Sequence, residues 1–539
     1  MSYQTGQVVD VTAGEAAHGG WCVARPDDGP VVFVRHALPG ERVLARITDV
    51  TARLARAEAI QILAASPDRV EPPCPHARPG GCGGCDWQHA ALPAQRSLKA
   101  AVIRQQLRRL AGLDIEVTVE PLPGDADAEP QAGLGWRTRV QFAVREDGLA
   151  GLRPHRSHDV IDIGRCLIAH PAITELGITG RNWKGVASVE AVVSAGSGER
   201  AVIISGPGKG GGGEETISAI GAESVLRRSG PRGLTPLRGR SYLSQHAAGR
   251  DWRVSAGAFW QVHPGAADAL AGAVTAWLDP KPGDVALDLY CGAGLFAGVL
   301  APAVGPSGTV VGVEADQAAV RDARHNLREW PWARVHRGDV AVLLRPEGAR
   351  VVLPAARLVV ADPPRSGLAR EVVEYLSAPE NGAVRFAYVS CDPATLARDI
   401  GLLTAQGWVL SGLRAFDAFP MTHHVECVAS LGRLGAGLGL GALARDVVAE
   451  TGDAGQQALV FQDAKRLGAS LAGVPVLLAE GGNGRRRHPG REGALGDLPA
   501  QHRGQAHVRP GVRFVAYRHS RTVLDWQYCQ SQRFDTSRD

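Results

Sequence analysis

VALDLYCGAGLFAG, residues 285–298, has the pattern of a buried strand that enters a glycine turn and then a helix. Gly292 and Gly294 let the backbone of this turn approach a bound ligand closely at the carboxyl edge of a sheet. A second strand, VVGVEAD, ends near Glu314, where nucleoside-cofactor folds place the carboxylate that binds the ribose hydroxyls. The alternative is a structural turn with a carboxylate that caps a helix. Together the two patterns predict a nucleoside-cofactor site.

Strands and helices alternate on both sides of this stretch, from Val254 to Leu431. The strands are VALDLYC, TVVGVEAD, RLVVADPP and RFAYVSCD. This order is typical of a parallel, doubly wound α/β sheet. Because the glycine pattern is D-x-x-C-G-x-G rather than G-x-G-x-x-G, it favours S-adenosylmethionine over NAD. We therefore predict a Rossmann-like methyltransferase domain over residues 254–431.

Three further residues are expected to face the cleft of this domain. In ADPPRSG, Asp362 precedes two prolines that fix a rigid loop. In AYVSCDPATLARD, Cys391 ends a strand, and the helix beginning near Pro393 is expected to lower the pKa of its thiol. This predicts a nucleophile, the alternative being a buried core cysteine. In FPMTHHVECVASL, Glu426 is a carboxylate in apolar surroundings and a candidate base.

A second group of residues has the spacing of a metal centre. Cys74, Cys82 and Cys85 lie close together in the sequence, and Cys166 follows far along the chain. Four such thiols suit zinc or an iron–sulfur cluster, and spacing alone does not separate the two.

The N-terminal residues predict a small all-β module. Short β-rich runs between residues 5 and 65 are separated by Gly, Pro and Asp turns, which fits a five-stranded, OB-like barrel. Small barrels of this kind bind oligonucleotides. The arginines of the module either line one RNA-binding face or are ordinary solvated side chains; they are Arg35, Arg42, Arg46, Arg53 and Arg56.

These patterns divide the chain into four parts. Residues 1–65 form the barrel, residues 66–253 a central mixed α/β domain with the cysteine segment, and residues 254–431 the catalytic domain. Within the central domain, helical periodicity over residues 91–112 predicts a helix with a basic face, placed to pack on the catalytic domain. Residues 432–539 lose apolar periodicity, and we expect a disordered tail there.

Composition narrows the class of protein further. The chain has 539 residues, 45% of them hydrophobic and 21% charged, which suits several globular domains. The formal net charge of +4 comes mostly from the tail, so contact with nucleic acid would depend on local basic patches. No apolar run is long enough to predict a membrane span, and the first twenty residues lack a secretory pattern. With nine cysteines read as reduced thiols, we expect a cytoplasmic protein without a membrane partner.

Four of these motifs carry a family resemblance. With VSCDPATLARD, ADPPRSG, FWQVHPG and DLYCGAG, the chain from Thr5 to Leu431 resembles the bacterial RNA uracil-5-methyltransferases. The N-terminal module resembles the TRAM domain with which many members grip RNA. The resemblance implies that Cys391 adds to uracil C6 as the nucleophile and that Glu426 removes the C5 proton.

The resemblance also implies the cofactors. CGGCDWQH matches the branch of the family that carries a [4Fe–4S] cluster, with zinc as the alternative. The expected S-adenosylmethionine-binding residues are Gln261, Tyr290, Gly292, Gly294, Glu314, Asp339 and Asp362. Two positions near that cofactor depart from the usual family pattern, His263 in place of Asn and Leu295 in place of a polar residue.

The expected function is therefore methylation of C5 of a uridine in structured RNA. A TRAM-like module with four cluster cysteines resembles the 23S rRNA enzymes more than the tRNA enzymes. A tRNA uridine-54 methyltransferase and a non-catalytic RNA-binding assembly factor are the alternatives. We expect a monomer that needs no protein partner.

Overall fold

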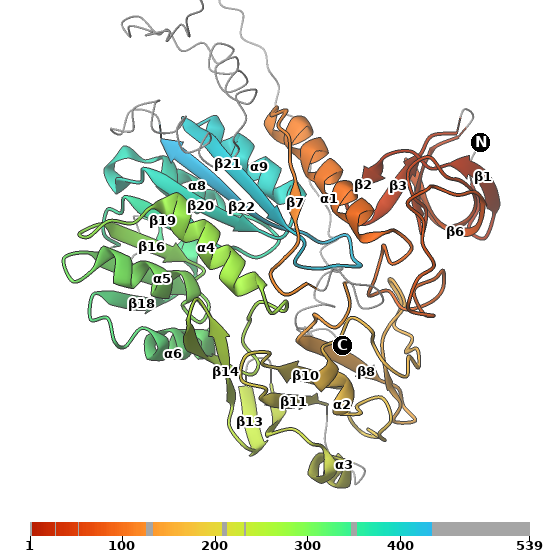
Figure 1. Cartoon of the computed structure of the whole chain (residues 1–539), viewed down its shortest axis with the longest axis horizontal. Helices are drawn as coiled ribbons and strands as arrows, with labels where there is room; N and C mark the ends of the chain where they lie inside the picture. The colour runs from red at the N-terminus through yellow and green to blue at the C-terminus, as the bar shows by residue number, and fades with distance from the viewer. Residues whose placement is uncertain are drawn as a thin grey trace, which may run out of the picture. The chain divides into compact units, whose positions relative to one another are not determined.

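The computed structural model of the chain describes residues 3–26, 29–51, 53–125, 133–206, 213–230, 233–345 and 353–433. Its largest sheet has eight strands in the order β18-β17-β16-β19-β20-β22-β21-β7 (Figure 1). The strands are β7 (Val119–Glu120), β16 (Val285–Leu289), β17 (Thr309–Glu314), β18 (Ala333–Arg337), β19 (Leu358–Ala361), β20 (Arg385–Ser390), β21 (Trp408–Phe416) and β22 (Glu426–Arg433). Strands β16 to β20 pair in parallel, and β22 pairs antiparallel with β20 and β21. The predicted doubly wound α/β fold is confirmed, with an antiparallel addition at one side.

Helices cover both faces of this sheet, as its almost continuously apolar strands require. They are α4 (Ala266–Leu278), α5 (Leu295–Val304), α6 (Gln317–Asn326), α7 (Val340–Leu343), α8 (Arg370–Ser377) and α9 (Pro393–Thr404), with a short 3-10 turn at Pro379–Asn381. Neighbouring residues of β16 enter different cores: Ala286 belongs to the core that includes Leu270 of α4, and Leu287 belongs to the core that includes Ile400 of α9. Because strands β16 to β20 are parallel, their carboxyl ends meet at one edge of the sheet, where the loops can form a site.

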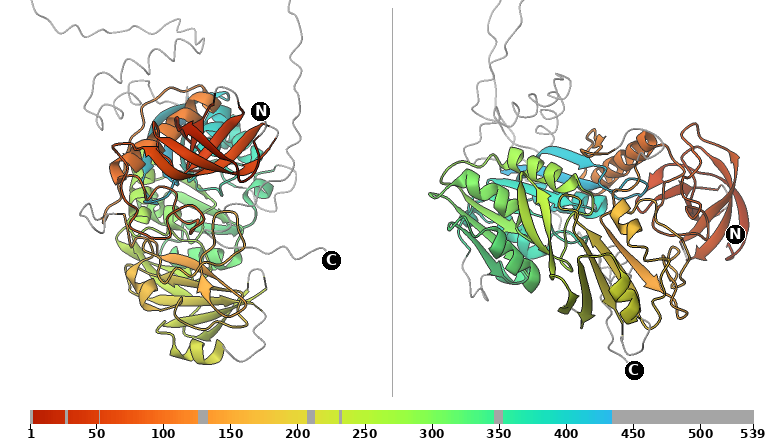
Figure 2. Two further views of the ribbon diagram at one scale, coloured as in Figure 1. Left: turned by 90° about the vertical axis from the view of Figure 1, so that its right-hand side faces the viewer. Right: turned by 60° about the horizontal axis from the view of Figure 1, so that its bottom comes forward.

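The N-terminal module is a six-stranded sheet in the order β1-β5-β6-β4-β3-β2 (Figure 2). The strands are β1 (Val8–Thr12), β2 (Ala16–Ala17), β3 (Trp21–Ala24), β4 (Val31–Arg35), β5 (Arg42–Val50) and β6 (Leu54–Ala64). The sequence predicted five strands, because β2 has only two residues and leaves no alternation to detect.

The arginines of this module do not form one RNA-facing row. Arg35 is 2% exposed and its guanidinium donates to Asp86 at 2.8 Å. Two others pair with carboxylates of the same sheet, Arg42 with Asp10 and Arg56 with Asp49. Of the five predicted arginines, three are therefore engaged within the protein.

The central region combines a second sheet with a long helix. The sheet has the order β13-β12-β11-β10-β8-β9, and a separate hairpin pairs β14 with β15. The elements are α1 (Leu92–Gln106) with a π turn (Leu107–Ala111), β8 (Arg139–Val144), β9 (Ala150–Gly151), α2 (Pro171–Glu175), β10 (Ser188–Val193), β11 (Arg200–Ser205), α3 (Gly213–Ala219), β12 (Ser224–Ser229), β13 (Gly233–Arg238), β14 (Tyr242–Ala247) and β15 (Arg250–Ser255). Helix α1 packs on the catalytic part, since Ile103 and Leu107 share a core with Ile400 of α9.

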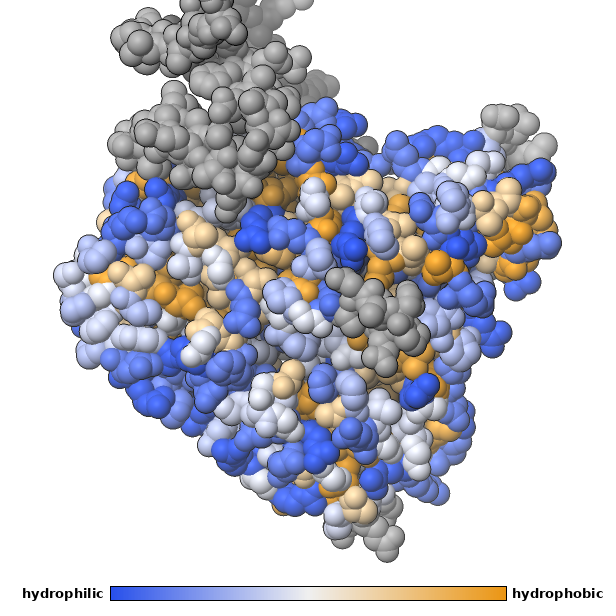
Figure 3. Space-filling view, viewed as in Figure 1, coloured by the Kyte–Doolittle hydropathy of each residue, from blue (hydrophilic) through white to orange (hydrophobic). Residues whose placement is uncertain are grey.

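One prediction lies almost wholly outside the described residues, the tail, of which residues from 434 onward are not described. None of the helices in the described part is long and apolar enough to cross a membrane. On the face that Figure 3 shows, apolar residues are scattered among hydrophilic ones.

Candidate active site

The register of two antiparallel strands brings the predicted nucleophile and base together. Ser390, the last residue of β20, pairs with Cys427 of β22. Cys391 follows β20 directly and Glu426 opens β22, so the two stand opposite each other at the next step of the ladder. The structure thus joins two residues that the sequence places 35 positions apart.

The electrostatics of Cys391 differ from the sequence-based expectation. Burial raises the pKa of its thiol, the charge of Glu426 raises it further, and Arg365 opposes the rise. The expected lowering by the N-terminus of α9 is wrong. The reason is that burial of the thiol outweighs any effect of the helix, and the charges of Asp362 and Asp392 add to the rise. Asp392 caps the start of α9, where its Oδ1 accepts the backbone N–H groups of Ala394 and Thr395.

Two carboxyl groups lie close to this thiol. Burial and the charge of Asp362 raise the pKa of Glu426 well above its usual value. Burial raises the pKa of Asp362 to about 7. The charge of Asp362 also raises the pKa values of Cys391 and Asp288. Asp362, expected at the cofactor, therefore lies within electrostatic reach of both the Cys391–Glu426 pair and the end of β16.

The glycine turn after β16 is built to receive a ligand. Gly292 has φ +53°, and a Cβ placed there would have no heavy atom within 4 Å. Its N–H donates to Oε2 of Glu314 at 3.0 Å, while Oε1 of Glu314 accepts the N–H of Asp316. Tyr290 just before the turn has φ +65°, an unusual conformation for a residue with a side chain.

A further residue at this turn escaped the sequence analysis. Asp288 is fully buried, and its Oδ2 accepts the N–H of Ala297 at 2.7 Å. Its Oδ1 has no hydrogen-bond partner among the described residues. Burial raises the pKa of Asp288 well above its usual value. A buried acceptor that lacks a donor, beside an open glycine turn, fits a cationic nucleoside cofactor such as S-adenosylmethionine.

The remaining expected cofactor residues surround this turn in part. Burial and the charge of Asp339 raise the pKa of Tyr290 to about 12, so these two side chains are neighbours. Asp339 also caps α7 through the N–H of Val342. Gln261 is 8% exposed and lines a separate hollow with Trp260, and no hydrogen bond joins it to the turn in the described part of the chain.

His263, one of the two departures from the family pattern, has a structural explanation. Its Nε2 lies 2.8 Å from Oδ1 of Asp125, and its ring stacks on Trp136 with ring centroids 5.9 Å apart. Its Nδ1 accepts the N–H of Gly265, just before α4. The other departure, Leu295, is the first residue of α5 and is buried in the core.

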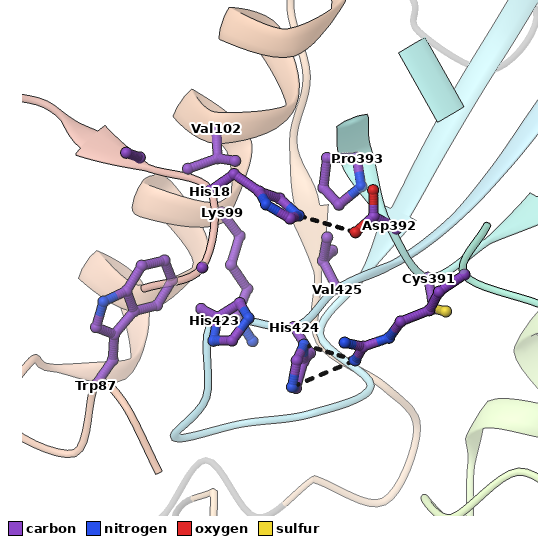
Figure 4. Close-up of a pocket in the computed structure, with 13 residues that line it drawn as sticks. His18, Trp87, Lys99, Val102, Cys391, Asp392, Pro393, His423, His424 and Val425 are labelled. Carbon is purple, nitrogen blue, oxygen red and sulfur yellow. Dashed lines mark hydrogen bonds and ion pairs between the residues drawn. The ribbon is translucent and has the colours of Figure 1, made fainter. Parts of the chain in front are cut away.

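A small hollow, partly open to solvent, lies beside Cys391 (Figure 4). Its lining residues come from six segments of the chain and are Ala17, His18, Gly19, Trp87, Lys99, Val102, Arg365, Cys391, Asp392, Pro393, His423, His424 and Val425. The Arg365 guanidinium donates to the ring of His424 at 3.0 Å. Burial and nearby cations hold the pKa of His424 well below its usual value, so its ring is neutral. The lining from the N-terminal half was not predicted, because no local motif marks it.

The four predicted cluster cysteines lie within electrostatic reach of one another. Burial raises the pKa of Cys82 to about 12, and charges on Cys166 and Cys74 add to the rise. Burial and charges on Cys166 and Cys82 raise the pKa of Cys85. Within the described residues, no group of three or more His, Cys, Asp or Glu side chains is arranged to hold a single metal ion.

The fold and the site define an S-adenosylmethionine-dependent methyltransferase, and comparisons with known proteins name its family. The family model for tRNA (uracil-5-)-methyltransferase matches residues 345–434, and the TRAM model matches residues 3–60. A model for protein-L-isoaspartate(D-aspartate) O-methyltransferase matches residues 262–341.

Curated relatives extend this match over most of the chain. An uncharacterized RNA methyltransferase of Streptomyces avermitilis is 50% identical over 441 residues, which cover 80% of this chain and 100% of that protein. One of Bifidobacterium longum is 35% identical and covers 77% of this chain and 94% of its own length. The chain belongs to the RNA uracil-5-methyltransferase family and carries its TRAM domain.

The fold is also similar to a solved structure. The Pyrococcus abyssi tRNA (uracil-54, C5)-methyltransferase in complex with S-adenosyl-L-homocysteine superposes with a TM-score of 0.59. That match has 22% identity and covers 78% of this chain and 99% of that chain.

Proposed function

We propose that the protein forms 5-methyluridine in RNA through a covalent adduct on Cys391, with Glu426 as the base that resolves it. The observation that carries this proposal is the pairing of β20 with β22, which sets the thiol and the carboxyl side by side. A thiol and a buried carboxyl at facing positions of two paired strands suit nucleophilic addition followed by proton abstraction.

The steps follow from uracil chemistry. As a thiolate, Cys391 Sγ bonds to C6, and the electron pair of the C5–C6 double bond moves toward O4 as an enolate. C5 then takes the methyl group as the bond between that group and the sulfonium sulfur of the donor breaks, which would leave S-adenosylhomocysteine. Because burial raises the pKa of Glu426, its carboxyl must first lose its own proton, and as a carboxylate it then accepts the proton that C5 still carries. The electron pair of the broken C5–H bond re-forms the C5–C6 double bond. The bond between C6 and Sγ breaks, and Cys391 is released as a thiolate. Because the free protein holds the Cys391 thiol protonated, its proton must leave before the first step.

S-adenosylmethionine supplies the activated methyl group when it is bound. We assign its site to the open turn at Gly292 and Gly294, with Glu314 anchoring that turn and the free Oδ1 of Asp288 available to a donor. Tyr290, Asp339, Gln261 and Asp362 complete the proposed set. Asp362 reaches toward both the cofactor turn and the Cys391–Glu426 pair, so it is suited to contact the reacting base between them.

The proposed substrate is a uridine of 23S rRNA, supported by the combination of a TRAM domain with four clustered cysteines. A tRNA substrate is the second candidate, favoured by the similarity to the Pyrococcus abyssi enzyme, which acts on tRNA uracil-54. The target base must leave its stack to reach Cys391, at a cost of a few kcal/mol. We also propose that the enzyme is cytoplasmic, since its RNA substrate is inside the cell. We propose that it is a monomer, with the domain limits given in the sequence analysis.

We also propose that Cys74, Cys82, Cys85 and Cys166 hold a [4Fe–4S] cluster. Buried thiols with raised pKa values stay neutral unless a metal holds them as thiolates. The four thiols lie within electrostatic reach of one another, and the CGGCDWQH motif favours a cluster over zinc.

The test is methyl transfer from labelled S-adenosylmethionine to 23S rRNA and, separately, to tRNA, both lacking 5-methyluridine. Label on rRNA that is lost in Cys391→Ala supports the proposal. Label on tRNA would support the same mechanism with tRNA, and not 23S rRNA, as the substrate. No label on either RNA, with intact RNA binding, would favour a non-catalytic assembly factor.

A further inference from the structure

The TRAM domain supplies a side chain next to the proposed nucleophile. His18 lies in the turn between β2 and β3, and its Nε2 is 2.9 Å from Oδ2 of Asp392. Asp392 is the residue directly after Cys391. Figure 4 shows this link at the rim of the hollow, with His18 reaching Asp392 from one side and Cys391 on the other.

The two oxygens of Asp392 hold two different parts of the protein. Oδ1 accepts the N–H groups of Ala394 and Thr395 and so fixes the start of α9. Oδ2 takes the hydrogen bond from His18. Burial alone would raise the pKa of Asp392, but the bond from His18 and the helix N–H groups lower it to about 2. Asp392 is therefore an acceptor, and His18 donates through its Nε2–H.

The turn that carries His18 is closely fitted to its surroundings. Gly19 and Gly20 have φ values of +91° and +80°, which favour glycine. A Cβ on Gly20 would lie 2.9 Å from the Cβ of Asp86 and 3.3 Å from the Cβ of His423. Asp86 in turn accepts a hydrogen bond from Arg35 of β4 at 2.8 Å. The turn that carries His18 therefore packs closely against Asp86 and against the loop between β21 and β22, which contains His423.

We propose that His18 is a positioning residue for Cys391, so that the TRAM domain completes the active site as well as gripping RNA. This inference rests on the proposed role of Cys391. Oδ1 of Asp392 is held by the first N–H groups of α9, and His18 holds Oδ2. The two contacts together fix the segment between β20 and α9, which contains Cys391. The thiol is then aimed into the hollow only when the TRAM domain is seated. The side chain of His18 lines this hollow and is 39% exposed.

The test uses full-length protein and transcripts of 23S rRNA and of tRNA that contain 5-fluorouridine. S-adenosylmethionine is included, because once C5 carries a methyl group and fluorine no proton remains to be removed. The adduct then persists and is counted as a band stable to denaturant. For His18→Ala we expect RNA affinity within about twofold of wild type. We expect the maximal rate of adduct formation at saturating RNA to fall about tenfold, which corresponds to about 1.4 kcal/mol in activation free energy. His18→Gln, whose amide N–H can donate to Asp392, should recover most of that rate.

The chain offers a matched control in another exposed His–Asp pair. His246 Nδ1 lies 2.9 Å from Oδ1 of Asp251 on the β14–β15 hairpin, and His246 does not line the hollow at Cys391. His246→Ala should leave the rate unchanged. A loss of RNA affinity at unchanged maximal rate in His18→Ala, or no recovery in His18→Gln, would overturn the inference. If wild-type protein forms no adduct with either RNA, the proposed function itself fails.

Discussion

Lys99 and Asp417 form a buried ion pair that ties α1 to the loop leading to Glu426. The Lys99 ammonium donates to Oδ1 of Asp417 and, at 3.0 Å, to the backbone carbonyl of Phe419. The two side chains are 0% and 1% exposed. Removing one partner of such a pair leaves the other charge buried and unpaired, at a cost of about 3–5 kcal/mol. We expect Lys99→Met to lower the free energy of unfolding by that amount.

The double variant distinguishes a coupled pair from two separate defects. Asp417→Asn alone should cost about as much as Lys99→Met, since it leaves the ammonium without its counter-charge. With both changes no charge remains, and burying one amide costs about 1–3 kcal/mol. The double variant should therefore be more stable than either single variant, and the two single losses should not add.

Thermal and urea unfolding of the full chain measure these losses. With an unfolding entropy of about 2.1 cal/mol/K per residue, a chain of 539 residues shifts by about 1 °C per kcal/mol, so Lys99→Met should lower the melting temperature by about 3–5 °C. The control is Arg370→Met, which breaks an exposed pair with Glu374 and should cost less than about 1 kcal/mol. If Lys99→Met were no worse than the control, or if the single losses simply added, the reasoning about the buried pair would be refuted.

Further expected outcomes concern the chemistry and the two cofactors. Glu426→Gln should accumulate a denaturant-stable RNA–protein complex, whereas Cys391→Ala should form none; normal turnover of Glu426→Gln would remove it as the base. Because the pKa of Cys391 is raised, the rate of adduct formation should still be rising with pH beyond about 8.5, the usual pKa of a thiol; a plateau near neutral pH would contradict this. Gly294→Ala, at φ +92°, should weaken S-adenosylmethionine binding in calorimetry by about 1–2 kcal/mol more than Gly305→Ala, at φ +65° outside the turn. Cys82→Ser should lower the iron and sulfide content of anaerobically purified protein, and unchanged content would exclude it as a ligand.

The sequence predicted the parts of the site that local patterns encode. A strand ending in Cys391 and a strand opening with Glu426 are each readable from a few residues, and the family motifs add their roles. The sign of the thiol pKa was not predictable in the same way, because it depends on burial in the folded protein. The cap at Asp392 could have been found, since an acidic residue before Pro and Thr is a helix-start pattern.

The contacts between regions were out of reach of the sequence for a physical reason. His18 and Asp392 are separated by 374 positions and Lys99 and Asp417 by 318, and no periodicity relates residues at such distances. Strand β7, of two residues, joins the catalytic sheet from within the region predicted as a separate central domain. The catalytic sheet therefore takes one of its eight strands from outside residues 254–431.

The loop between β21 and β22 shows why these contacts matter for the reaction. Its Met421 carbonyl accepts the N–H groups of Asp86 and Trp87, both at 3.1 Å, and its Met421 N–H donates to Gln95 of α1 at 2.8 Å. Asp86 directly follows Cys85, one of the proposed cluster ligands. The segment that would hold the cluster is thus bonded to the loop that ends at the proposed base. Ordering that segment would fix the base in place, so a cluster without a redox step has a mechanical reason to be present in a methyl-transfer enzyme.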